Sequence, residues 1–556
     1  MPSDALEKQA ELCARSPKTA GLWAVLARMR LEAGRFGECI AAAERALALN
    51  PKNTVARTAR EGALKALEQL DPALAVADLN AALKPNDAAA QLELGRAYLN
   101  VDRPAEAARL LNRALELEPE MPPALASLGA AYLSVGMDEA AEHYCRRALA
   151  ARPGEPVASQ TLSTVLEKRG ERAEAEAVLD ALYERTSLFV ERAAAPIATV
   201  LVLATRTNGN VPYRHLLPPS RFSRLVWYME HAQETQVAAM PPYDTVFNAI
   251  GDPDLGARTF EITALLNGRL GKPPLNPPAR IGPTRRDRLP TLLSDIPGVL
   301  APETVRLDGA DIEARGLRAS IQSRGLEPPL LIRPVGSHGG LGLERIDNWA
   351  ALDALQPHYA GAEAYVTRYV DYSSADGWHR KGRIIFVDRR PYPYHWAIGR
   401  NWLVHYQTAG MAGDAARQAE ERRFLEAPEA FLGLEAMAAI AEIGRRIDLD
   451  YCGVDFSILP DGRVLVFEAN ATMLVHPEEP DGEFAYKNPA FTRIVAAFQS
   501  LVQERARSEN ADCEKLLIRT AASSPTALQQ RPERWGAIRQ SSASRGWRPR
   551  KAQRGQ

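Results

Sequence analysis

The sequence predicts a multidomain protein in which an all-α solenoid of helical repeats is followed by an α/β (α+β) region. In the N-terminal third, prolines recur with a period of 34 residues, at positions 51, 85, 119 and 153. Residues 197–204 form a short, continuous apolar run, as in buried parallel strands. Near the C-terminus, two apolar segments flank Pro460-Asp-Gly462, as expected for a β-hairpin.

The repeats extend over roughly residues 5–185. Leu94-Gly95-x-x-Tyr98 recurs as Leu128-Gly129-x-x-Tyr132, in phase with the prolines. This period and these residue types resemble the tetratricopeptide repeat, a helix–turn–helix unit. We therefore expect five units, the second of them degenerate because Arg60-Glu61 replaces Leu-Gly. Residues 1–187 are assigned to this solenoid.

Stacked helix pairs of this kind form a superhelix with a concave groove, which usually holds a peptide or a protein. We therefore expect a protein or peptide partner for the repeats. The alternative is a dimerisation or purely structural arm.

Residues 196–305 are predicted to form a small α/β subdomain on the substrate side of the site. The run at residues 197–204 is too short to span a membrane and is predicted to be a strand, as is Tyr243–Asn248. Ligands of open α/β sheets bind at the carboxyl ends of strands. Polar residues follow both strands and are candidates to line an acceptor site: Thr205, Arg206, Asn208, Asn248 and Asp252.

A glycine-rich loop follows the apolar run that ends at Arg333-Pro334. Its glycines are Gly336, Gly339, Gly340 and Gly342. They allow close backbone approach and inward-pointing N–H groups, which suits phosphate oxygens. No Lys-Ser/Thr follows, so the loop is not a P-loop. Alone, the same pattern is compatible with a mobile surface loop.

The C-terminal hairpin carries the strongest chemical signal. Asp461-Gly462 is a favoured two-residue hairpin turn, because both positions favour positive φ. Pro460 would then pair with Arg463, and Asp455 would lie directly opposite Glu468. Opposed side chains have Cβ atoms about 4.5–5.5 Å apart, and like charges there repel. We therefore expect a cation between the two carboxylates.

Asn470 lies two residues beyond Glu468 and hence on the same face of its strand. Two carboxylates and an amide oxygen are ligands that suit Mg²⁺. The predicted metal ligands are therefore Asp455, Glu468 and Asn470. The alternative is a hairpin with two acidic residues, one of which faces solvent.

Together, these segments resemble the ATP-grasp superfamily, and within it the glutathione synthetase-like group of carboxylate–amine ligases. The resemblance covers roughly residues 196–505 and implies a nucleotide- and metal-binding domain over residues 306–505. It implies that Asp455, Glu468 and Asn470 hold Mg²⁺ ions that bridge the phosphates of ATP.

The resemblance also implies the residues that contact ATP. The glycine loop would close over the β- and γ-phosphates, and the strand at 363–371 would be a hinge whose backbone contacts adenine. Asp371 or Asp376 would bind ribose, and the sequence does not choose between them. The remaining predicted nucleotide contacts are Gly336, Ser337, His338, Gly339, Gly340, Arg368, Tyr369 and Val370. His338 is either a phosphate contact or an exposed loop histidine.

The sequence departs from the family pattern at two cations. Arg333 and Arg288 stand where the family usually has lysines that bind phosphate. Arginine binds phosphate in a planar, bidentate way, so the charge is kept while the geometry changes. Arg383 matches an arginine that would contact phosphate or acyl phosphate, and its alternative is a solvated charge. Arg333 and Arg383 are the predicted catalytic residues.

A third departure is the insertion Tyr372–His379, which lengthens the hinge. By resemblance, the chain is an ADP-forming ligase that activates a carboxylate as an acyl phosphate and joins it to an amine. The acceptor could be a peptide or protein bound by the repeats. The alternatives are an ATP-grasp kinase and a non-catalytic ATP-binding scaffold.

Composition indicates an ordinary globular protein. The chain has 556 residues, a net charge of −1 and 46% hydrophobic residues. Five scattered cysteines without Cys-x-x-Cys favour a reducing compartment over a zinc site. The first residues lack the apolar core of a signal peptide, so we expect a cytoplasmic protein without a membrane partner.

Residues 506–556 are predicted to be a basic, disordered tail. Residues 531–556 hold eight Lys or Arg and one acidic residue. We expect a solvated tail, with binding to nucleic acid or to an acidic partner as the alternative.

Overall fold

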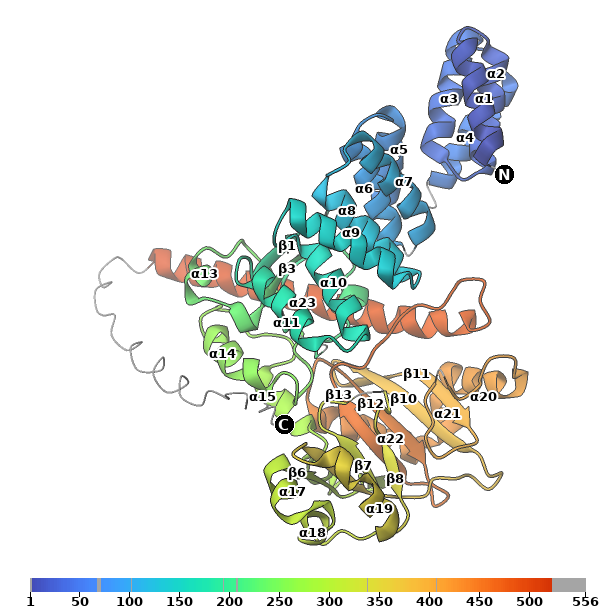
Figure 1. The fold of residues 1–556 in the computed structure, drawn as a ribbon. Helices are drawn as coiled ribbons and strands as arrows, with labels where there is room; N and C mark the ends of the chain where they lie inside the picture. Colours follow the sequence, from blue (N-terminus) through green and yellow to red (C-terminus); the bar gives the residue numbers. More distant parts are fainter. Residues whose placement is uncertain are drawn as a thin grey trace, which may run out of the picture. The chain divides into compact units, whose positions relative to one another are not determined.

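The computed structural model describes residues 3–67, 72–101, 103–193, 195–206, 209–337, 339–406 and 408–522. The described residues up to Arg507 form one compact unit, and those from Ser508 belong to a second. Within the first unit, a helical N-terminal region is followed by an α/β region (Figure 1), which confirms the predicted fold class. Among the described residues, no helix combines the length and apolarity needed to cross a bilayer.

The helical region contains α1 (Ser3–Arg15) and then five helix pairs. The first helices of the pairs begin 34 residues apart: α2 (Ala20–Glu32), α4 (Thr54–Leu67), α6 (Ala88–Asn100), α8 (Pro122–Ser134) and α10 (Pro156–Lys168). The second helices are α3 (Phe36–Leu49), α5 (Pro72–Leu83), α7 (Pro104–Leu117), α9 (Asp138–Ala151) and α11 (Arg172–Tyr183). Each periodic proline follows the end of a second helix by two residues, because proline cannot continue a helix.

Small residues lie where paired helices touch. A Cβ atom placed on Gly95 would lie 2.8 Å from Cγ of Leu111. A Cβ atom on Gly129 would lie 2.6 Å from Sγ of Cys145. The helices therefore pack closely only because these positions carry no side chain.

The repeats share a core with the α/β region that follows. Tyr183 of α11 packs on Tyr228 with ring centroids 4.2 Å apart. Arg206 donates to the Asp180 carboxylate over 2.5 Å. The last repeat is thus continuous with the first α/β sheet.

That sheet has the strand order β1-β3-β2-β4: β1 (Leu188–Glu191), β3 (Phe222–Tyr228), β2 (Ala198–Ala204) and β4 (Thr245–Asn248). Strand β2 runs parallel to β3 and β4, and β1 is antiparallel to β3. The predicted buried parallel strand is therefore confirmed by β2. The helices of this part are α12 (Tyr213–Leu216), η1 (Met229–His231), α13 (Glu234–Ala238), α14 (Ala257–Asn267), α15 (Pro278–Ile281), η2 (Gly282–Thr284) and α16 (Leu289–Leu293).

A second sheet is antiparallel and has the order β6-β9-β7-β8. Its strands are β6 (Thr304–Leu307), β9 (Ala364–Arg368), β7 (Leu330–Pro334) and β8 (Glu344–Ile346). One face buries Leu330, Ile332 and Val366. The accompanying helices are α17 (Gly309–Arg315), α18 (Leu317–Gln322), α19 (Trp349–Leu355) and η3 (Gln356–Tyr359).

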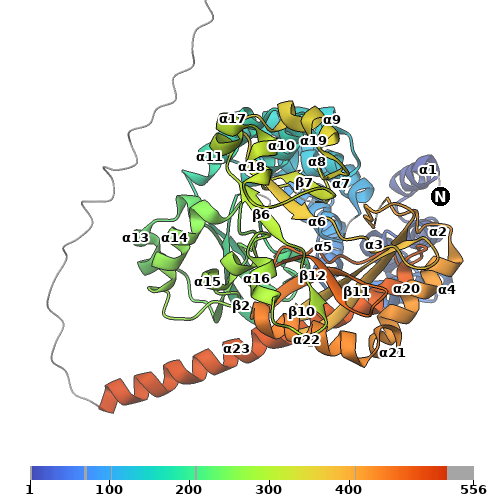
Figure 2. The same cartoon turned by 90° about the horizontal axis from the view of Figure 1, so that it is seen from below.

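The third sheet has the order β11-β10-β12-β13-β5. Its strands are β11 (Arg390–Gly399), β10 (His379–Val387), β12 (Tyr451–Ile458), β13 (Val464–Asn470) and β5 (Val299–Leu300). All its pairings are antiparallel except that of β13 with β5. Figure 2 shows helices on one side of this sheet: α20 (Ala415–Glu426), α21 (Pro428–Leu432) and α22 (Leu434–Ile447).

The β12–β13 hairpin confirms one prediction and corrects another. Asp455 lies opposite Glu468 as expected. The turn, however, has three residues, because the Leu459 N–H donates to Arg463 O and only Gly462 in the loop has a positive φ, 87°. A β-bulge at Phe467 inserts one further residue into β13 and restores the expected register. The two-residue turn was therefore wrong, although the pairing that it predicted is present.

The C-terminal helix also differs from the predicted tail. After η4 (Ala485–Lys487), α23 runs from Asn488 to Ala522, well past residue 506. Residues 506–522 contain neither proline nor glycine, so nothing in them interrupts a helix that has already begun. The predicted disorder is wrong up to Ala522, and residues 523–556 lie outside the described residues.

Candidate active site

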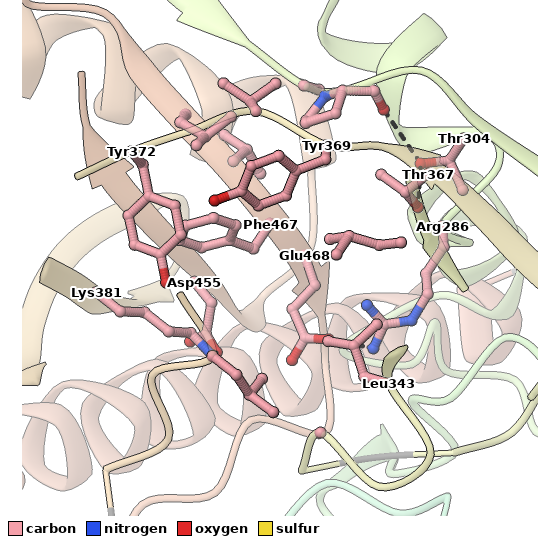
Figure 3. A pocket seen from close by; sticks show the side chains of 18 of the residues that line it. Arg286, Thr304, Leu343, Thr367, Tyr369, Tyr372, Lys381, Asp455, Phe467 and Glu468 are labelled. Carbon is pink, nitrogen blue, oxygen red and sulfur yellow. Dashed lines mark hydrogen bonds and ion pairs between the residues drawn. The ribbon is translucent and has the colours of Figure 1, made fainter. Parts of the chain in front are cut away.

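A cavity of about 170 Å³ lies between the second and third sheets. One end is lined by apolar and aromatic side chains, and the other by charged ones (Figure 3). The apolar end includes Tyr369, Val370, Tyr372, Trp402, Leu465 and Phe467. The charged end includes Arg286, Arg333, Lys381, Arg383, Asp455 and Glu468.

The aromatic end depends on the bulge in β13. Phe467 is the extra residue of the bulge, and its ring packs edge-on to Tyr372 with centroids 4.9 Å apart. Tyr372 is held in place because its hydroxyl donates to the carbonyl of Trp402. Tyr369 packs edge-on to Trp402 at 6.3 Å. These rings form an apolar slot of the kind that accepts a flat heteroaromatic ligand.

Asp455 is fully buried and is held by two cations from β10. Arg383 donates through Nε and Nη2 over 2.6 Å and 3.0 Å, and Lys381 Nζ lies 2.7 Å from Oδ2. Lys381 and Arg383 are two residues apart on one strand, so their side chains share a face. Burial alone would raise the pKa of Asp455, but Arg383 and Lys381 outweigh it and hold the pKa well below its usual range.

Glu468 is paired with a different cation. Arg286, from the loop between η2 and α16, forms an ion pair with its Oε2 atom. Burial acts to raise the pKa of Glu468, and Arg286 nevertheless lowers it below the usual value. Both carboxylates therefore carry a full negative charge at neutral pH.

These ion pairs correct the argument that the facing carboxylates require a metal. Asp455 and Glu468 are each neutralised by side chains from other elements, so the protein itself relieves their repulsion. Among the described residues, no three His, Cys, Asp or Glu side chains gather around one point that could hold a metal.

The predicted ligand set nevertheless fits Mg²⁺ by its chemistry. Asp455, Glu468 and Asn470 offer only hard oxygen atoms, and they lie on neighbouring strands. Asn470 Oδ1 accepts one hydrogen bond, from the Thr472 hydroxyl at 3.0 Å. Glu468 lines both the main cavity and a smaller one that Asn470 also lines.

The glycine loop runs between these two cavities. Gly339 and Gly340 line the main cavity, whereas Gly336 and Ser337 line the smaller one. All four glycines of the loop have positive φ values, between 62° and 79°, which explains the choice of glycine. His338 lies outside the described residues.

Arg333 holds the base of the glycine loop. Its Nε atom donates to Ser337 Oγ over 3.1 Å, and its Nη2 atom donates to the Ser337 carbonyl. Ser337 Oγ in turn donates to Pro334 O over 2.7 Å. Burial and the nearby Arg286 lower the pKa of Arg333 to about 10. The planar guanidinium contacts both atoms of Ser337 through two different nitrogens, a geometry that the single ammonium of a lysine does not reproduce.

A second loop meets the glycine loop over the cavity. A Cβ atom on Gly340 would lie 3.5 Å from Leu403, and one on Gly339 would lie 3.7 Å from Nε2 of His405. Leu403 and His405 line the cavity. Burial lowers the pKa of His405 below its usual value, which favours a neutral ring.

Two predicted nucleotide contacts are not brought to the cavity. Arg288 is exposed and absent from the lining, which Arg286 occupies instead. Asp376 pairs with Arg380 at 2.8 Å outside the lining, and Asp371 is also exposed. The hinge residues Arg368, Tyr369 and Val370 do line it.

Most candidate acceptor residues are occupied within the fold. Asn248 is fully buried and donates to Asn276 O over 2.9 Å. Thr205 donates to Glu230, and Arg206 is paired with the repeats. Of the described candidates, Asp252 alone borders a cavity, the smaller one. Asn208 lies outside the described residues.

The sequence argument missed several residues that line the cavity. Lys381 could have been found, because strand alternation places it on the same face as Arg383. Arg286 is one of three arginines in a short loop, and no pattern distinguished it from Arg288. Phe467 could not have been found, because the bulge that exposes it has no sequence signal.

Comparisons with known proteins agree with two different parts of the chain. Residues 88–121, the third helix pair, match the tetratricopeptide repeat family. The structure of MamA protein matches with 22% identity and a TM-score of 0.20, covering 30% of this chain and 92% of that one. No curated protein sequence matches the chain.

Two further solved structures match more of the chain. VanG D-Ala:D-Ser ligase from Enterococcus faecalis matches with 14% identity and a TM-score of 0.34, covering 55% of this chain and 99% of that one. A RimK domain ATP-grasp protein from Sphaerobacter thermophilus matches with 17% identity and a TM-score of 0.33, covering 54% of this chain and 100% of that one. These TM-scores lie below 0.5, so we infer the function from motifs and sheets of this chain alone. These are the glycine loop after β7, the hinge strand β9, and the facing carboxylates of β12 and β13.

Proposed function

We propose that this chain, a fusion of tetratricopeptide repeats with an α/β region of ATP-grasp type, is an ATP- and Mg²⁺-dependent ligase that forms a C–N bond. The observation that carries the proposal is the cavity itself. It joins an aromatic slot to a cluster of cations beside two facing carboxylates. Adenine fits the slot, and a triphosphate fits the cations.

The roles of individual residues follow from their positions. Tyr369, Tyr372 and Phe467 would enclose adenine. Arg286, Lys381 and Arg383 would bind phosphate oxygens. Asp455, Glu468 and Asn470 would hold Mg²⁺, which, when bound, would neutralise phosphate charge and orient the transferred phosphoryl group.

The reaction that suits this site begins with attack by a substrate carboxylate oxygen on the γ-phosphorus. The bond to the bridging oxygen breaks, which yields ADP and an acyl phosphate. An amine then attacks the acyl carbon, phosphate leaves, and the amine loses a proton. The arginines and Lys381 act by positioning and charge stabilisation rather than as nucleophiles. Contact between the glycine loop and the 402–405 loop would keep water away from the acyl phosphate.

Calorimetric titration of Mg·ATP into the full-length chain tests the site. Asp455→Asn should abolish metal-dependent binding, whereas Asp461→Asn, on the exposed turn of the same hairpin, should not change it. Equal binding by both variants would contradict the site assignment. If ATP binds, release of free phosphate with an amide product supports the ligase, and a phosphorylated product indicates a kinase instead.

We also propose that the repeats bind a peptide or protein, in support of the same reaction in the cytoplasm. The five helix pairs support a partner-binding role. Arg96 lies on α6, the first helix of its pair, and Arg113 lies on α7, the second. Variants at these two positions therefore compare the surface formed by the first helices with that formed by the second helices. Arg96→Glu and Arg113→Glu should differ in their effect on KM for a protein acceptor. An unchanged KM in both would argue against the proposed acceptor site.

A further inference from the structure

Both oxygens of Asp455 and one oxygen of Glu468 are already paired with side-chain cations. Asp455 Oδ1 accepts from Arg383, and Oδ2 accepts from both Arg383 and Lys381. Glu468 Oε2 is paired with Arg286. Because Oδ2 of Asp455 already contacts two cations, a divalent cation that binds this oxygen must displace Lys381 or Arg383 from it.

That displacement is unfavourable in the absence of nucleotide. The side chains of Lys381 and Arg383 are only 21% and 18% exposed. A divalent cation on Asp455 would lie beside both charges in a region where water screens little, so repulsion would oppose its binding. Desolvated cations that lose their carboxylate partner also incur a cost.

A triphosphate changes this balance because it provides new partners for the cations. Arg286, Arg333, Lys381 and Arg383 outnumber Asp455 and Glu468 at the charged end. Phosphate oxygens can accept from the displaced side chains, which frees the carboxylates for a metal. Metal and nucleotide would then each make the other's binding more favourable.

Lys381 is the side chain best suited to exchange. It contacts Asp455 through a single Nζ atom on a flexible stem, whereas Arg383 makes two fixed contacts. Figure 3 shows Lys381 reaching toward Asp455 within the cavity, while Arg286 comes from the opposite wall. The other charged or titratable groups near Asp455 are Arg383, Glu468, His395 and His405.

We infer that Lys381 occupies the place of a divalent cation on Asp455, and that a bound nucleotide must draw it away before the metal can bind. This inference rests on the proposed nucleotide site. Its consequence is that the chain takes up metal only together with nucleotide, and Lys381 sets the strength of that coupling.

Titration of Mn²⁺ into the full-length chain tests the inference, with bound metal followed by loss of the free-ion paramagnetic resonance signal. Each titration is made with and without a non-hydrolysable ATP analogue. We expect the analogue to tighten Mn²⁺ binding to the wild type by about tenfold to a hundredfold. Lys381→Met should tighten nucleotide-free binding by about tenfold, because it removes one adjacent positive charge.

Three further variants make this result specific. Lys381→Arg keeps the charge and should leave nucleotide-free Mn²⁺ binding as weak as in the wild type. Lys168→Met removes a lysine from a comparable 2.8 Å ion pair, with Asp138 in the repeats, and should change nothing. Asp455→Asn should abolish tight metal binding in every background, which assigns the signal to this site.

The outcomes separate the inference from the proposed function. If the wild type binds Mn²⁺ tightly without nucleotide, and also binds the analogue when it is supplied, the inference alone is overturned. An Lys381→Met variant with unchanged nucleotide-free affinity would do the same. Failure of the folded wild type to bind the analogue, with or without metal, would overturn both.

Discussion

The repeats and the cavity are built from contacts of opposite kinds. In the repeats, small apolar residues of neighbouring helices touch, as Gly95 does with Leu111. In the cavity, charged side chains meet across long separations in the chain, and Arg286 and Glu468 are 182 residues apart. The first arrangement depends on shape and the second on charge. Changes in the repeats should therefore alter stability, and changes in the cavity should alter function.

The largest expected effect is on catalysis. Glu468→Gln keeps the size of the side chain and a hydrogen-bond acceptor for Arg286 but removes the charge that would bind Mg²⁺. We expect kcat for ADP release to fall by at least about a hundredfold, the scale for losing one preorganised electrostatic contact. Thermal unfolding should change little by comparison. Glu479→Gln, an exposed residue, is the control, and equal activity of the two variants would contradict the assignment.

The second effect should appear in stability alone. Gly129→Val places a side chain against Cys145 and the Ala141 carbonyl, where a Cβ atom already lies within 2.6 Å and 3.1 Å. We expect about 1–3 kcal/mol of destabilisation from overpacking, measured by denaturant unfolding. ATP binding by the folded protein should not change. Gly21→Ala is the control, because nothing lies within 4 Å of that position. Loss of ATP binding by folded Gly129→Val would contradict the expectation that changes in the repeats alter stability alone.

A smaller effect should show whether shape also matters inside the cavity. Arg333→Lys keeps one positive charge but loses the fixed two-nitrogen contact with Ser337. We expect KM for ATP to rise severalfold, about 1 kcal/mol for one lost hydrogen bond, with a smaller change in kcat. Faster proteolysis within residues 336–342 should accompany it. Ser337→Ala should reproduce part of the effect. If Arg333→Lys changes neither the rate of proteolysis nor KM for ATP, Arg333 does not hold the glycine loop in the way described.

The smallest effect should come from a surface ion pair. Arg380 holds the pKa of Asp376 down, from its usual value to about 2. A depressed pKa in the folded state stabilises the protein above the unfolded pKa, and that stability is lost as the pH falls from about 4 toward 2. Because Asp376 is 48% exposed, we expect less than about 1 kcal/mol. Asp376→Asn should thus unfold more easily than the wild type at pH 6, and the difference should shrink as the pH falls toward 2. A difference that grows toward acid would contradict this pKa.

The outcome at the hairpin shows what pattern arguments can and cannot provide. Strand alternation predicted that Asp455 faces Glu468, and the ladder has that pairing. The predicted turn was wrong by one residue, and the bulge at Phe467 compensated for the error. Alternation specifies which face a residue occupies, but an extra residue depends on packing against Tyr372, which the local sequence does not reveal.

The cations show the same limit more strongly. Arg383 was expected at the site from the resemblance to the ATP-grasp superfamily, and it lies beside Asp455. Arg288 was expected and is exposed, while Arg286 and Lys381 were not considered and line the cavity. Which of the three arginines in the loop between η2 and α16 lines the cavity depends on the local path of that loop, and the path has no periodicity.

The sequence by itself determined the repeats, the fold class and the facing carboxylates. Each of these depends on spacing along the chain, because helices and strands repeat at constant intervals. Only the tertiary structure decided which cations neutralise Asp455 and Glu468, which rings line the slot, and how Arg333 is used. Those contacts join β10, β13 and loops far apart in the chain, so they exist only once the sheets have packed around the cavity.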